Sequence, residues 1–204
     1  MNLLQTMPGR IVLMALVQTA VLGAVVGEHA ITLATGREMI VKTEPVDPRD
    51  LFRGDYVVLR YGMSEVEVNG LAGDRSFAPG DTVYVTLASR GDDWTPVALH
   101  HRKPSADTVK PDERMLRAAV DYVYEGLERP TVEEGRPACP APCTTLRITY
   151  GIESYFVPEG TGHALEAERN KERVGVVIAV RRDGRAAIKA LQLDGKTIAR
   201  EGLF

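Results

Sequence analysis

The chain opens with a long apolar run and then changes to an alternating pattern. Residues 11–27 carry no charge, and their only polar members are one Gln and one Thr. A helix rises 1.5 Å per residue, so this run is at the short end of a membrane span, and neighbouring apolar residues extend it to roughly 20 residues. Arg10 and Glu28 mark its two ends. The pattern predicts a transmembrane anchor within residues 1–30.

A cleaved signal sequence is the main alternative, because the run lies near the N-terminus. Cleavage needs small residues just before the cut. A cut after Ala24 would place Leu22 at the third position back, and a cut after Ala30 would place Glu28 there. These residues favour an uncleaved anchor. A cleaved signal and the buried helix of a soluble protein stay open as alternatives.

The flanking charges give little information on orientation. Arg10 precedes the span, and Arg37 and Lys42 follow it closely. A long C-terminal domain translocates largely regardless of its charges, and a single span with a short head usually leaves the head in the cytoplasm. We therefore expect the C-terminal domain outside the cytoplasmic membrane.

Beyond residue 30 the apolar positions recur with a period of two, which is typical of strands. A first strand contains Ile40 and Val41 and ends at Pro45. Further strands are expected at residues 56–63, 64–68, 82–89 and 96–102, and this close spacing is typical of antiparallel sheets. Near the C-terminus, Asp183-Gly184 predicts a hairpin with a type I′ turn, and Asp194-Gly195 predicts a second turn.

Two segments are less regular. Residues 105–120 have apolar positions at helical spacing, but a return to strand after residue 120 is equally readable. A short helix is expected to begin at Thr161 or Gly162. The fold class that follows is mainly β: an antiparallel sheet or partly open barrel with one or two short helices, over residues 31–204.

The segment "PVDPRDLFRGDYVVLRY" at residues 45–61 predicts a capped helical turn followed by a strand. Asp47 is an N-cap before a proline, Gly54 stops the helical turn, and an alternating strand follows.

The predicted turn and strand do not require four side chains of this segment, namely Arg53, Asp55, Tyr56 and Tyr61. Arg and Tyr are favoured in binding sites because planar donors and rigid rings hold partners at low entropic cost. In the purely structural reading, Arg53 and Asp55 tie the turn to the sheet while the tyrosines pack on its faces.

An internal echo links two distant segments. Residues 59–68 and 146–157 each contain a strand, a Tyr-Gly step and a second strand. Equivalent strands of one sheet or barrel would produce this pattern, and chance resemblance is the alternative.

The two cysteines, Cys139 and Cys143, have three residues between them in a proline-rich loop. An oxidising compartment would favour a local disulfide, which would stabilise by roughly 2 kcal/mol or less because the ring is small. Two free thiols are the alternative. The spacing differs from that of redox dithiols and zinc knuckles, so we expect no metal site.

Composition excludes several functions. The net charge is −3 with both signs mixed along the chain, so no basic face for nucleic acid is expected. The four histidines lack ligand spacing, and no cofactor is expected.

The chain contains candidate residues for two kinds of enzyme. A serine protease of the signal peptidase type needs a Ser-Met-x-Pro context after the anchor, but Ser64 is followed by Glu and Val. An acid/base pair for glycan cleavage would come from Asp47, Asp50 and Asp55, or from Glu153, Glu159 and Glu166. Capping and solvation explain these carboxylates more simply, so no catalytic residue is assigned.

Residues 54–61, "GDYVVLRY", match the pattern GDYXXLXY in full. With the preceding "PVDPRDLFR", the later "YFVPEG" and the C-terminal Asp-Gly turns, the chain resembles the GDYXXLXY family of uncharacterised bacterial membrane-anchored proteins. The resemblance implies a location in the bacterial cytoplasmic membrane with a periplasmic or extracellular domain, and it supplies no activity, substrate or catalytic residue.

The sequence therefore predicts a membrane-anchored, non-enzymatic binding or assembly module of the bacterial envelope. Residues 11–27 would contact the membrane, and the partner would be another envelope protein or a small ligand. Its candidate binding residues are Arg53, Asp55, Tyr56, Tyr61 and Glu159. The alternative function is an envelope hydrolase of glycan or peptide that uses carboxylates of the GDY and PEG motifs.

Overall fold

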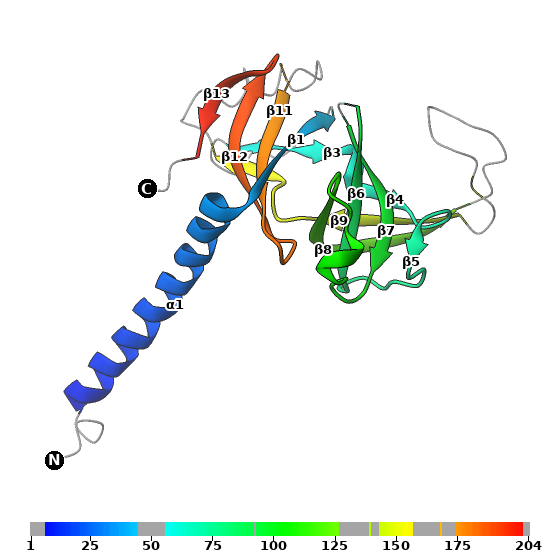
Figure 1. The fold of residues 1–204 in the computed structure, drawn as a ribbon. Helices are drawn as coiled ribbons and strands as arrows, with labels where there is room; N and C mark the ends of the chain where they lie inside the picture. Colours follow the sequence, from blue (N-terminus) through cyan, green and yellow to red (C-terminus); the bar gives the residue numbers. More distant parts are fainter. Residues whose placement is uncertain are drawn as a thin grey trace.

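A computed structural model describes residues 7–44, 56–91, 93–126, 139, 143–156, 168 and 174–201. A single long helix projects away from a body built of β-strands (Figure 1). The predicted fold class is confirmed: the body is mainly antiparallel β, and the described strands do not close into a barrel.

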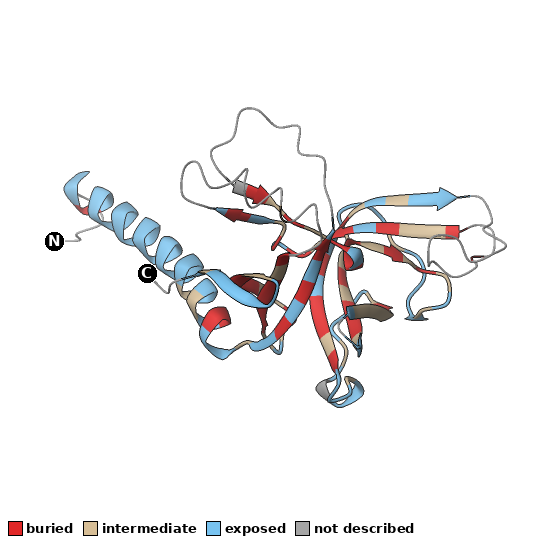
Figure 2. Ribbon diagram, turned by 90° about the horizontal axis from the view of Figure 1, so that it is seen from above, coloured by how far each residue is buried: buried red, intermediate tan, exposed pale blue. Residues whose placement is uncertain are grey.

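The helix α1, Met7–Thr35, is exposed along most of its length (Figure 2). Its large apolar side chains face outward, with Leu16 and Leu22 exposed at 63% and 67%. It is long and apolar enough to cross a membrane, and the apolar window is not buried in the body. A core helix of a soluble body would bury this surface, whereas an anchor or a signal sequence would not.

The helix continues past residue 30 to Thr35, into a segment whose pattern suggested the approach to a strand. The Thr32 hydroxyl donates to the Glu28 carbonyl at 2.9 Å, and the Thr35 hydroxyl donates to the Ile31 carbonyl at 2.8 Å. Thr32 and Leu33 are buried where the last turns of α1 contact the strands β11 and β12. Tertiary packing therefore keeps this β-branched segment helical.

One sheet has five strands in the order β13-β12-β11-β1-β3. Its strands are β1 Arg37–Glu44, β3 Arg60–Tyr61, β11 Val174–Val180, β12 Ala186–Leu193 and β13 Lys196–Arg200. One residue separates the end of α1 from the start of β1, and the residues of β1 are alternately exposed and buried. β11 is buried at nearly every position because β1 and β12 flank it.

The second sheet has six strands in the order β4-β9-β8-β6-β7-β5. Its strands are β4 Glu65–Glu67, β5 Ala72–Gly73, β6 Thr82–Arg90, β7 Asp93–His100, β8 Glu113–Gly126 and β9 Cys143–Thr149. β5 pairs with β7 in parallel, and the other pairs are antiparallel.

Shorter elements complete the body. The strands β2 Tyr56–Val58 and β10 Ser154–Phe156 form a separate antiparallel pair. Two 3-10 turns, η2 Gly62–Ser64 and η3 Ala106–Thr108, lie in connections between strands. One hydrophobic cluster draws residues from both sheets and from the β2–β10 pair, so the body shares a single core.

The helical prediction for residues 105–120 is wrong, because β8 begins at Glu113. The predicted return to strand after residue 120 is confirmed as far as Gly126. In β8, Leu116, Ala118 and Val120 are buried while Arg117 and Ala119 are exposed. β8 pairs with β6 on one side and β9 on the other. Pairing with two long strands therefore makes this segment a strand, although its local pattern fits both a helix and a strand.

The two Asp-Gly turns differ. Asp194 and Gly195 both have positive φ, at +47° and +78°, which is the type I′ geometry. At the other turn only Gly184 is left-handed, with φ of +88°, and its N–H donates to the Arg181 carbonyl at 3.0 Å. This is a three-residue loop closed by a left-handed glycine, so the predicted type I′ turn at Asp183-Gly184 is wrong in type.

Candidate functional site

The candidate binding residues fall into two groups. Arg53, Asp55 and Glu159 lie outside the described residues. Tyr56 begins β2, where only its backbone is described. Tyr61 is described in full, and its side chain is 1% exposed.

Tyr61 and Tyr150 make a reciprocal pair of buried hydrogen bonds. The Tyr61 hydroxyl donates to the Ile152 carbonyl at 2.6 Å, and the Tyr150 hydroxyl donates to the Met63 carbonyl at 2.8 Å. Each acceptor lies two residues after the other tyrosine. Burial, with a smaller contribution from a nearby carboxylate, raises the pKa of both phenols well above the usual value. Both rings therefore act as neutral donors inside the core.

The strand pairing around these tyrosines repeats in the same way. With the two Tyr-Gly steps aligned, β4 corresponds to β10, and β2 corresponds to residues 145–147 of β9. β4 pairs with residues 145–147, and β10 pairs with β2, in the same antiparallel register. Each segment thus supplies one strand to the other. The sequence echo reflects two structurally equivalent units that are intertwined.

Glu153, one of the candidate catalytic carboxylates, is engaged in a turn. It accepts the backbone N–H of Tyr150 at 2.5 Å and of Gly151 at 2.9 Å. A carboxylate that accepts two backbone donors is held as a turn cap. Its place in the fold is thereby explained without catalysis.

The side chains that would converge in a hydrolase are mostly outside the described residues. Ser64 is described and is 9% exposed, and its hydroxyl has no hydrogen-bond partner within the described part of the chain. His101, at the end of β7, contacts the Ser76 carbonyl at 2.8 Å and stacks on Phe77. The described residues therefore give Ser64 no base, and they place His101 in a loop contact.

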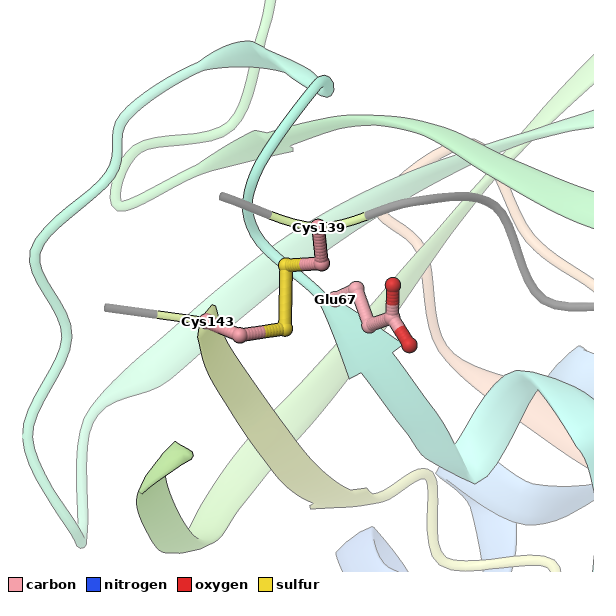
Figure 3. Close-up of side chains that lie close together, drawn as sticks. All are labelled: Glu67, Cys139 and Cys143. Carbon is pink, nitrogen blue, oxygen red and sulfur yellow. A yellow bond between two sulfur atoms is a disulfide. The ribbon is translucent and has the colours of Figure 1, made fainter. Parts of the chain in front are cut away.

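Cys139 and Cys143 form a disulfide with a Cα–Cα distance of 5.5 Å. The Glu67 side chain, at the end of β4, lies beside it (Figure 3). One ligand atom of each of the three residues lies within 4.8 Å of the others. Two thiolates and a carboxylate would suit zinc, but sulfurs in a disulfide are not thiolates. Sequence spacing missed Glu67 because it comes from a distant strand.

A groove lies where α1 meets the body, with a volume of about 530 Å³. Glu28 and His29 line its helical side, and Arg117 and Arg185 line its sheet side. Arg185 pairs with the Glu28 carboxylate. Within the described part of the chain, Arg117 has no ion-pair partner. No local pattern predicts this site, because its lining comes from α1, from strands β6, β8 and β9, and from the β11–β12 turn.

Comparison with known proteins identifies one family. Residues 18–191 match the family described as "GDYXXLXY protein". The match includes most of α1 and nearly all of the body. No curated protein and no solved structure matches the chain.

Proposed function

Because this chain belongs to the GDYXXLXY family, we propose that it is a single-pass membrane protein whose β body acts as a non-enzymatic binding or assembly module. The body would lie on the outer side of the bacterial cytoplasmic membrane, and its partner would be another envelope protein or a small ligand.

The observation that carries the proposal is the exposure of α1. Its apolar window is unburied, and large apolar side chains point outward around the helix. Water would not favour so much exposed apolar surface, whereas a bilayer core would. The charge-free run between Arg10 and Glu28 has the length of a short span.

The joint between α1 and β1 supports a rigid attachment of the body to the membrane helix and argues against a flexible linker. Only Gly36 separates the two elements, and its N–H donates to the Thr32 carbonyl at 2.9 Å. A Cβ at this position would lie 2.6 Å from the Thr32 oxygen and 2.8 Å from Ala179. The helix is therefore packed directly on the first sheet, and the body would keep a fixed orientation to the membrane.

The register of the β2–β10 pair supports a shared site for the GDY and PEG segments. Tyr56 and Phe156 are register partners at one end of the β2–β10 pair. Asp55 is bonded to Tyr56, and Glu159 follows Phe156 by three residues. Phe156 is 80% exposed, and aromatic side chains are enriched in binding interfaces. We expect the partner to bind at this end of the pair.

The experiment is co-purification after mild detergent extraction of the full chain. We expect Phe156→Ala and Arg53→Ala to reduce recovery of the partner about tenfold, the usual effect of removing one strong interface side chain. The control is Tyr122→Ala, since Tyr122 is an exposed aromatic at 59% on a different strand, β8. Equal recovery by all four proteins would contradict a binding site at this end.

The alternative hydrolase uses the same place, because Asp55 and Glu159 would supply its carboxylates. Turnover of envelope glycan or peptide that is lost in both Asp55→Asn and Glu159→Gln would favour the enzyme over the module. Location is tested separately with a phosphatase fused after Phe204. Activity of the fused phosphatase supports the outer placement, and an inactive but intact fusion contradicts it.

A further inference from the structure

The residues that line the groove at the base of α1 take no part in the proposed binding site at the β2–β10 pair. We propose that this groove binds the headgroup phosphate of an anionic phospholipid in the surrounding leaflet. The inference rests on the proposed membrane anchoring by α1.

The first argument is position. The charge-free run of α1 ends at Glu28, so Glu28 and His29 would lie at headgroup level. The groove is lined by Val25, Glu28, His29 and Thr32 on the helix, which recur at helical spacing on one face. The groove would therefore open at the height where lipid phosphates are found.

The second argument is continuity with the apolar surface below. Val25, in the groove wall, is 64% exposed, and Val21 one turn earlier is 58% exposed. Leu22, three residues before Val25, is also exposed. A lipid whose phosphate entered the groove would lay its acyl chains along this face of α1. A soluble anion would make no use of that surface.

The third argument is the proximity of two arginine residues. The Arg117 N–H of β8 donates to the Gly184 carbonyl at 2.7 Å, and Arg185 is the next residue along the chain. A Cβ at Gly184 would lie 2.8 Å from the Arg117 nitrogen. This close backbone contact brings Arg117 of β8 next to Arg185 of the β11–β12 turn, and both residues line the groove.

The fourth argument is charge. The two arginines face one carboxylate in the lining, that of Glu28, and it pairs with Arg185. Arg185 also pairs with Asp183, whose carboxylate lies 3.9 Å from the Arg185 Nε and accepts the Arg185 backbone N–H at 3.3 Å. Arg117 is left with no ion-pair partner among the residues that the structure describes. Guanidinium groups bind phosphate through two parallel hydrogen bonds, so an anionic headgroup complements this lining.

The experiment titrates the full chain in detergent micelles with phosphatidylglycerol or with phosphatidylcholine of the same acyl chains, and native mass spectrometry measures the first bound lipid. We expect the wild type to bind phosphatidylglycerol more tightly. Arg117→Gln should weaken that binding about tenfold, the effect expected for loss of one charge-assisted hydrogen bond. Glu28→Gln should strengthen it by up to about fivefold, because the competing carboxylate is removed.

The matched control is Arg75→Gln. Arg75 is exposed near β5, which lies on the side of the body away from α1 (Figure 1), and this variant should bind like the wild type. Equal binding of the two lipids, or equal effects of the Arg117 and Arg75 substitutions, would overturn the proposal. Displacement of bound lipid by glycerol 3-phosphate at matching concentration would also overturn it, because the groove would then be a soluble-anion site.

The micelle measurement reports headgroup selectivity wherever the chain resides in the cell. Retention of the chain in membranes is measured separately, so failure of the lipid site is distinguishable from failure of the anchor.

Discussion

At the scale of single residues, Tyr61 explains part of the family signature. Its ring is buried and its hydroxyl satisfies the Ile152 carbonyl, while Leu59 of the same signature is 1% exposed. Buried carbonyls that lose their donor cost the full desolvation of that group. Two of the five residues that the GDYXXLXY pattern specifies are thus accounted for by folding alone.

We expect Tyr61→Phe to lower the free energy of unfolding by about 1–3 kcal/mol, because the Ile152 carbonyl would lose its donor. Tyr150→Phe should cost a similar amount, since its bond to the Met63 carbonyl is the counterpart. The measurement is urea unfolding in detergent, followed by the fluorescence of Trp94, which packs against the core. Tyr122→Phe is the exposed control; a loss as large in this variant would contradict the account.

The same two phenols predict a dependence of stability on pH. Their folded-state pKa values are raised by burial, whereas tyrosine in an unfolded chain titrates near pH 10. Above about pH 10 the unfolded state releases protons that the folded state retains, so stability falls as pH rises. Below that pH their contribution is fully present.

Urea unfolding at about pH 8 and about pH 11 checks this direction, with lower stability expected at the higher pH. The double variant Tyr61→Phe/Tyr150→Phe should lose less between the two conditions. An identical loss in the wild type and the double variant would assign the effect to other groups.

Sequence reasoning grouped Tyr61 with possible recognition residues and could not distinguish packing from binding. Its hydrogen-bond acceptor lies 91 residues away along the chain, in a segment that no local pattern connects to it. The echo between the two Tyr-Gly steps was the available signal. Only the paired register of β2, β4, β9 and β10 shows what the echo means.

At the scale of elements, the joint between α1 and β1 is a tightly packed connection. We expect Gly36→Val to destabilise the body by about 1–3 kcal/mol, because the new side chain would meet the Thr32 oxygen and Ala179. Thermal unfolding in detergent, followed by Trp94 fluorescence, measures the effect. The control is Gly23→Val, because a Cβ at Gly23 has nothing within 4 Å. Equal melting temperatures would contradict a packed joint.

Elements with strong local signals were predictable, and those decided by partners were not. The alternating strand β1 and the type I′ turn at Asp194-Gly195 follow from their own residues. The strand β8 does not, since its first half has apolar residues at a spacing that also suits a helix. Pairing with β6 and β9 resolves it. The extension of α1 to Thr35 likewise depends on burial of Leu33 against the sheet.

At the scale of the whole molecule, the sites are assembled from distant segments. The groove joins α1 to β8 and to the β11–β12 turn, and Glu67 reaches the disulfide from a separate strand. The composition and the residue spacing of the chain do not predict which of these distant residues become neighbours. The apolar run, by contrast, is visible in the sequence because a bilayer imposes its own length and polarity.

The central claim is that α1 holds the β body to the membrane as an uncleaved anchor. Alkaline carbonate extraction of membranes that contain the full chain, followed by intact mass measurement, tests it most directly. We predict that the protein stays in the membrane pellet and retains α1, Met7–Thr35. Release of the protein into the supernatant, or recovery of a chain that begins beyond α1, would contradict it.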